Sequence, residues 1–235
     1  MTEDYPDWNS YNYTMNNPIN LIDPDGNTPI SWPPKWYTNL SNQYNKLSPA
    51  EKNLPKAYWG IGYQMRYNKG SHTVGTIATN FSLMGSSKSG NSILSPETKT
   101  STGSINGIRH ATLSAMSYAK FLDSGVNATL SAHENNVSVD PKQTIFKTYN
   151  EVDMAADFKN NQMGKQIADE LGMSGPFTSN KDIFSKVLDK AFNEGVWQGV
   201  KTKNGYELKQ IKLTEKVYCQ LKDALLNKDN NAEWK

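Results

Sequence analysis

The sequence predicts a mainly helical, bundle-like protein with one small β-hairpin near the C-terminus and an irregular N-terminal extension. After residue 104, apolar residues recur at the three- and four-residue spacing of amphipathic helices. An Asn204-Gly205 pair lies between two stretches of alternating apolar and polar residues, a pattern typical of a two-residue hairpin turn. Asn, Ser, Thr and Lys are concentrated in the first hundred residues, which favours a loosely packed extension.

Residues 1–103 predict turns, short helices and a long loop. Asn17-Pro18 and Asp23-Pro-Asp-Gly26 predict two turns around a short β segment. Four apolar residues then fall at helical spacing: Trp36, Leu40, Tyr44 and Leu47. A further helix is expected from Ser48, with a proline in its first position and Glu51 completing a capping box, and Pro55 should interrupt it. Residues 83–104 have low complexity and predict a loop.

We expect the folded helical domain to span residues 104–235. Two other regions precede it, at residues 1–29 and 30–103. The expected helices of the domain are 108–122, ended by Gly125, then 126–133, 152–171, closed by Gly172, 183–192 and 214–226. The hairpin strands are expected at 195–200 and 206–213.

The composition of the chain limits the classes of function and of site that are expected. The chain has 25 Lys and Arg against 23 Asp and Glu, a net charge of +2, and no dense basic stripe, so nucleic-acid binding is not favoured. A single cysteine, Cys219, excludes internal disulfides and cysteine-based zinc sites, and its helical setting predicts that it packs inside. We expect no transmembrane segment, because no apolar run is long enough, and no signal peptide, because the first residues are acidic.

Three polar stretches in predicted helices combine histidine, carboxylate and amide side chains. They are Asn106 to His110, His133-Glu134, and Asp157 to Asn161. On a helix Asp157, Asn161 and Gly164 share a face, with Asn160 alongside. Three helices offering such groups to one centre would form a polar site inside a bundle. The same residues could instead form structural ion pairs, with the asparagines exposed at the surface.

These residues support a hypothesis about chemistry. His110, His133 and Asp157 are suitable ligands for a divalent metal ion, and Glu134 would then be the general base that activates a bound water. Arg109 would hold an anionic group such as a phosphate, while Asn160 and Asn161 orient ligands or substrate. In a metal-free version Glu134 or His133 is the base, and Arg109 remains the anion-binding residue.

Two segments resemble known families. Tyr13-Thr-Met-Asn-Asn-Pro-Ile-Asn-Leu-Ile-Asp-Pro-Asp-Gly26 resembles the end of the core of bacterial Rhs/YD-repeat polymorphic toxins, after which a variable toxin domain follows. Residues 104 to about 215 are similar to a helical family found at the C-termini of such toxins. That family has an Arg-His-Ala, a His-Glu and an Asp-x-x-Asn-Asn-x-x-Gly motif, matched here by Arg109-His110-Ala, His133-Glu134 and Asp157 to Gly164. The chain departs from the family in having Asn106-Gly107 where an Asp-Ala pair is usual, and Ala156 where Met is usual.

The resemblance implies a secreted antibacterial toxin that a type VI or related route delivers into a neighbouring bacterium as part of an Rhs parent chain. It also implies a cognate immunity protein. We expect a hydrolase that acts on an envelope component, either lipid, peptidoglycan or a precursor. The alternatives are a nuclease acting in the target cytoplasm and a non-enzymatic binding domain.

Overall fold

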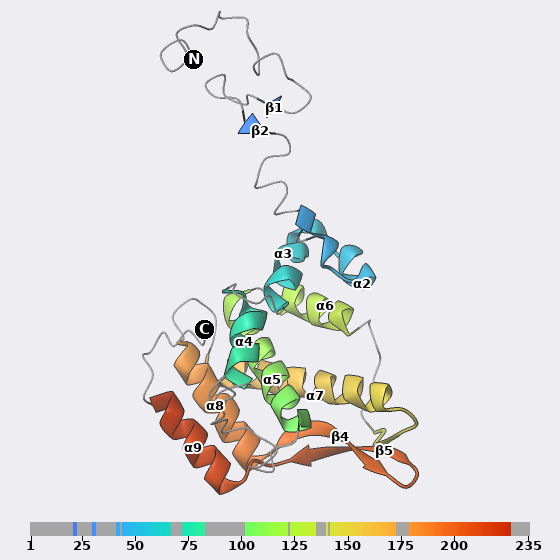
Figure 1. Cartoon of the computed structure of the whole chain (residues 1–235), viewed down its shortest axis with the longest axis vertical. Helices are drawn as coiled ribbons and strands as arrows, with labels where there is room; N and C mark the ends of the chain where they lie inside the picture. Colours follow the sequence, from blue (N-terminus) through green and yellow to red (C-terminus); the bar gives the residue numbers. More distant parts are fainter. Residues whose placement is uncertain are drawn as a thin grey trace, which may run out of the picture. The chain divides into compact units, whose positions relative to one another are not determined.

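The computed structural model describes residues 21–22, 30–31, 41–42, 44–66, 72–82, 102–121, 123–134, 140, 142–172 and 179–226. The chain divides into two compact units, Met1–Leu47 and Ser48–Lys235. In the first, β1 (Leu21–Ile22) pairs antiparallel with β2 (Ile30–Ser31), so a β segment does lie between the two expected turns. Residues 41–42 and 44–45 are helical, residues 46 and 47 form a turn and a bend, and the other residues of the predicted helix, 36–40 and 43, lie outside the described residues. The second unit confirms the predicted fold class: it is mainly helical, with a small antiparallel sheet (Figure 1).

The second unit begins with two helices whose boundary the sequence predicts. Ser48 caps α2 (Pro49–Lys52), where its Oγ accepts from the Glu51 backbone and its own N–H donates to Glu51 Oε2 at 2.7 Å. Pro55 is the N-cap of α3 (Lys56–Met65), which confirms the predicted interruption. A further helix, α4 (Val74–Ser82), is absent from the sequence prediction, although Thr73 precedes it and its Oγ1 accepts from the Thr76 N–H at 3.2 Å, as an N-cap does.

The next two helices differ from the prediction in where one ends and the other begins. α5 (Thr102–Lys120) begins inside the expected loop of 83–104, most of which lies outside the described residues. The sequence predicts that Gly125 ends a helix, and this prediction is wrong. Gly125 lies buried in the first turn of α6 (Asp123–His133). A Cβ at Gly125 would be only 2.6 Å from Ile61 Cδ1, so this glycine serves the close packing of α6 on α3.

The remaining helices follow their predicted positions closely. α7 (Tyr149–Glu170) begins three residues before the predicted start, because Thr148 and Glu151 form a second capping box. It is followed by Gly172 in the left-handed region at φ 65°, as its predicted closing role requires. α8 (Asn180–Asn193) and α9 (Glu215–Leu226) complete the set.

The predicted hairpin is confirmed and gains a third strand. β4 (Val196–Thr202) and β5 (Gly205–Ile211) pair antiparallel, and Gly205 adopts φ 131° in the turn. The two-residue β3 (Ile145–Phe146) pairs with the other edge of β5, giving the order β3-β5-β4. A strand of two residues has no alternation to detect, so sequence patterning does not predict it. The sheet packs against α7, and β4 also contacts α5.

The main core surrounds α5, which contacts α4, α7 and α8. Phe81 of α4 stacks on Phe184 of α8 with ring centroids 4.1 Å apart, so α4 belongs to this core. Cys219 is exposed on α9, and the expectation that it packs inside is wrong, because the buried face of that helix carries Val217, Leu221 and Leu225. Within the part of the chain that the structure describes, no helix has the length and apolarity needed to cross a membrane.

Gly164 brings α7 against α5, which positions the functional site. A Cβ there would overlap the Ala111 carbonyl oxygen and lie 2.5 Å from Ser114 Cβ. We therefore expect Gly164→Ala to lower the free energy of unfolding by about 2 kcal/mol through overpacking. Gly60→Ala in α3 is the matched control, because nothing lies within 4 Å of a Cβ there and alanine favours a helix. Urea unfolding of both variants tests this; equal stability of the two would contradict the close-approach role.

Candidate functional site

Three helices bring the predicted polar stretches together. α5 supplies Arg109 and His110, the C-terminal end of α6 supplies Glu134, and α7 supplies Asp157. α5 and α7 run in close contact along their length, and α6 lies against α5. Sequence spacing cannot predict this convergence, because it depends on how the helices cross.

His110 lies between two carboxylates. Its Nε2 is 3.3 Å from Asp157 Oδ1, and its Nδ1 is 4.0 Å from Glu134 Oε1. One candidate ligand atom from each of these three residues lies within 4.8 Å of the other two. Ligand atoms bonded to one Zn²⁺ at about 2.0–2.2 Å are about 3–3.5 Å apart, so the three side chains would have to move closer together to share one ion. We call His110, Glu134 and Asp157 the triad.

Asn106 and Arg109 fix the triad from α5. Asn106 Nδ2 donates to Asp157 Oδ1 at 2.9 Å, and its Oδ1 accepts from Arg109 at 2.5 Å. The same guanidinium nitrogen is 3.0 Å from His110 Nε2. Asn106 therefore supports Asp157 through a neutral hydrogen bond.

Burial and charge shift the pKa values of the triad. Desolvation, with the Arg109 charge, lowers the pKa of His110 to about 3, although the nearby Asn161 amide opposes the fall. Its imidazole is therefore neutral near pH 7, the form that binds metals. Desolvation, reinforced by Glu134 and Asp153, raises the pKa of Asp157 to about 8. Burial also raises the pKa of Glu134.

The site holds more acidic groups than basic ones. Asp153 lies one turn before Asp157 on α7, and its charge raises the pKa of both Asp157 and Glu134. Arg109 is the cation that lowers both. Three carboxyl groups are thus set against the Arg109 guanidinium and the neutral His110, with the charge of His133 acting on Glu134 as well. Such an excess of carboxylates favours binding of a divalent cation.

His133 belongs to a different cluster from the one predicted. Its Nδ1 is 3.6 Å from Glu51 Oε1, and Glu51 also forms an ion pair with Arg66 at the end of α3. Glu51 is only 1% exposed. The predicted metal set of His110, His133 and Asp157 is therefore brought together in part: Glu134 takes the third place, and His133 links α6 to α2.

The two asparagines of α7 have separate environments. Asn160 makes both of its side-chain hydrogen bonds to the backbone of Trp197, accepting at 2.9 Å and donating at 2.8 Å, so it anchors the start of β4 to α7. Asn161 is 6% exposed and its Oδ1 has no hydrogen-bond partner, and the same is true of His110 Nδ1. The Asn161 side chain lies close enough to His110 to raise its pKa, but neither atom makes a full hydrogen bond, which leaves both able to bind a ligand.

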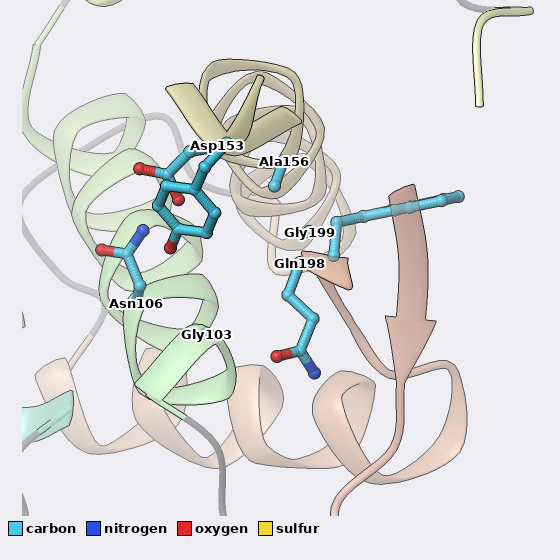
Figure 2. A pocket seen from close by; sticks show the side chains of 8 residues that line it. Gly103, Asn106, Asp153, Ala156, Gln198 and Gly199 are labelled. Carbon is cyan, nitrogen blue, oxygen red and sulfur yellow. The ribbon is translucent and has the colours of Figure 1, made fainter. Parts of the chain in front are cut away.

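A small cavity of about 160 Å³ lies beside this site, between α5, α7 and β4. Figure 2 shows Asn106 and Asp153 facing the same space, with Gln198 and Gly103 at its other end. Asn106 joins this cavity to the triad, because it also bonds to Asp157. A second cavity, of about 180 Å³, is lined by Glu134 and Asn161.

The sequence does not predict that Glu51 lies beside His133 or that it forms an ion pair with Arg66. Glu51 has a complete local explanation as the capping-box residue of α2, so nothing in the sequence indicates a second role. Arg66 lies fifteen residues away and gives no spacing signal. Asp153 carries a weak signal, since it precedes Asp157 by one helical turn.

Comparison with protein-family models, with curated proteins and with solved structures found no match to this chain. What can be inferred about its function therefore comes from its residues and their geometry.

Proposed function

We propose that the chain is an antibacterial toxin whose helical domain is a metal-dependent hydrolase. The hydrolase assignment is carried by one observation: the triad of His110, Glu134 and Asp157, in which His110 and Asp157 are buried. The toxin assignment rests on the Rhs-like segment Tyr13 to Gly26. With it come delivery into a neighbouring bacterium by a type VI or related route and protection of the producer by an immunity protein.

The charge of the site supports a metal ion. The triad offers one neutral imidazole and two carboxylates, a donor set typical of Zn²⁺ and Mn²⁺ sites. When bound, such an ion makes hydroxide available near neutral pH. In the proposal Asn106 holds Asp157 in place, and Arg109 binds negative charge that develops on the substrate.

A second candidate is a metal-free hydrolase. The contact that favours it is Arg109, whose guanidinium is 3.0 Å from His110 Nε2 and already supplies positive charge. Glu134 would then take the proton from water, and burial raises its pKa, which makes its carboxylate a stronger base.

The proposed target is an envelope component. The net charge of +2 and the absence of a basic stripe from the sequence give little attraction for the phosphate backbone of a nucleic acid. A nuclease acting in the cytoplasm remains the alternative, and the location at which the protein kills separates the two.

We expect the full chain to stop growth of a bacterial host only when an export signal directs it to the periplasm. Glu134→Gln should remove killing and weaken Mn²⁺ or Zn²⁺ binding at least about 10-fold, because it replaces a charged ligand with a neutral amide of the same shape. His133→Ala should lower metal affinity much less, because His133 contacts Glu51. Circular dichroism checks folding, and calorimetry measures metal binding.

The other outcomes are equally informative. Killing only from the cytoplasm would shift the target to nucleic acids or nucleotides. If the wild-type protein binds no metal and its killing still requires Glu134, the metal-free mechanism would be favoured. A chain that harms neither compartment, or a folded Glu134→Gln variant that kills as well as wild type, would overturn the enzyme proposal.

A further inference from the structure

The cavity lined by Glu134 and Asn161 reaches the triad from the side of α6. It lies between α5, α6 and α7 and has a volume of about 180 Å³, room for a group of a few heavy atoms. Glu134 is shared between this cavity and the triad. A group bound in the cavity would therefore lie directly beside the proposed catalytic centre.

Asn161 supplies an independent sign of a ligand. Asn161 is only 6% exposed, it lines the cavity, and its Oδ1 has no hydrogen-bond partner. Leaving a buried amide oxygen unpaired is unfavourable. A ligand that carries an N–H or O–H donor would remove that cost on binding.

The charges around the cavity argue against an anionic ligand. Lys165 is the cation of its wall, but its ammonium is 3.3 Å from both Asp123 and Asp169 and lies over the Tyr118 ring at 4.9 Å. That ammonium is therefore already neutralised. Glu134, by contrast, is a carboxyl group that lies beside Asp157 and within the field of Asp153, so a phosphate or carboxylate entering here would meet repulsion from these acidic groups.

The other lining groups match a neutral amide. Three side-chain amides face the cavity, those of Asn127, Asn161 and Gln162, and each can both donate and accept hydrogen bonds. The Oδ1 of Asn127 accepts from the Tyr118 hydroxyl at 2.5 Å, which leaves its N–H groups to donate to a ligand. Leu130 and Phe158 form an apolar part of the wall that suits a methyl or methylene group.

We propose that this cavity binds a secondary amide of the substrate and presents its carbonyl carbon to the triad. The inference rests on the proposed hydrolase and names the substrate class as an amide. Water oxygen bonds to the carbonyl carbon, and the carbon–nitrogen bond breaks. Both water protons finish on nitrogen, so the products are a carboxylate and an ammonium group. In an envelope, N-acetylated sugars and peptide crosslinks both carry such amides.

Ser131→Phe tests the cavity without altering the triad. Ser131 is exposed at the edge of the cavity on α6, and a phenylalanine ring there would occupy the space. Ser124→Phe is the matched control, because Ser124 is exposed seven residues earlier on the same helix and does not line the cavity. Purified sacculi, N-acetylglucosamine oligomers, short stem peptides, phospholipid vesicles and RNA are each incubated with wild type and both variants, and new amines and acetate are measured.

We expect new amines from an amide substrate with wild type and Ser124→Phe, and at least about a 10-fold lower rate with Ser131→Phe. Metal affinity should be the same in all three proteins. Acetate release would identify the N-acetyl group as the amide, and new amines without acetate would identify a peptide bond. Cleavage of phospholipid or RNA alone, or equal rates for the two variants, would overturn the amide proposal while leaving the hydrolase intact. Absence of both metal binding and hydrolysis in wild type would instead remove the proposed function on which it rests.

Discussion

Asp157→Asn is expected to abolish killing while raising the melting temperature of the metal-free protein by about 5 °C. The two effects have one cause. Asp157 lies among Glu134 and Asp153 in a buried position, and this raises its pKa to about 8. The ionised carboxylate that would bind a metal ion therefore destabilises the folded state while the metal is absent. Asparagine keeps the shape and can still accept from Asn106, but it carries no charge.

The sign of the pH dependence follows from that raised pKa. The folded protein holds a proton on Asp157 that the unfolded chain releases above about pH 4. Folding of the wild type must therefore become less favourable as pH rises from about 4 to about 8, by an amount on the order of a few kcal/mol. The Asp157→Asn variant loses this contribution, so the stability difference between variant and wild type should grow across that range.

Thermal unfolding with EDTA, at pH 4, 6 and 8, measures this difference, and about 2–4 °C corresponds to each kcal/mol for a chain of this size. Asp223→Asn is the control, since Asp223 is exposed on α9. Metal titration of the same proteins gives the second half of the prediction, a loss of at least about 10-fold in affinity. A variant that is destabilised, or one that still binds metal and kills, would show that Asp157 is a structural residue.

Glu51→Gln should lower the free energy of unfolding by about 3 kcal/mol at pH 7. Glu51 is buried beneath α2, where its carboxylate pairs with Arg66 and lies 3.6 Å from His133. Removing one member of such a pair leaves the other charge without its partner in a partly buried position, which is the costly way to break it. Because Glu51 ties α2 to both α3 and α6, loss of its charge should loosen all three helices.

Acid changes the contribution of Glu51 to stability in the opposite direction to that of Asp157. Burial opposes its ionisation, but His133, the Ser48 N–H and Arg66 outweigh burial and lower its pKa to about 2. Its contribution to stability is therefore complete above the ordinary glutamate pKa of about 4.5 and is lost as pH falls from there toward 2. The wild type and Glu51→Gln should differ most above pH 5 and converge in acid.

Glu151→Gln provides a close control, because Glu151 has the same capping-box position in α7 but is exposed. Glutamine also serves in capping boxes, so this variant should lose less than about 1 kcal/mol. Urea unfolding of both variants from pH 3 to pH 7 measures the comparison. Equal losses in the two would mean that Glu51 acts only as a cap and that its ion pair with Arg66 adds nothing.

Local chemistry explains why the sequence predicts most elements correctly. Ser48, Pro55 and Gly172 each act on the backbone within a few residues, and the Asn204-Gly205 turn needs no distant partner. Gly125 shows where this reasoning fails. As a glycine it resembles a helix stop, but its role is to admit Ile61 of another helix, and no local pattern records that contact.

The same distinction between local sequence signals and contacts with distant residues applies to the candidate site. The sequence by itself determined which residues are chemically suited to a polar centre: Arg109 and His110 belong to one predicted helix, Glu134 follows a second and Asp157 belongs to a third. Only the tertiary structure decided which of them meet. It placed Glu134 beside His110 and turned its chain neighbour His133 toward Glu51, because adjacent residues on a helix point about 100° apart and the packing of α6 between α2 and α5 selects which one faces each side.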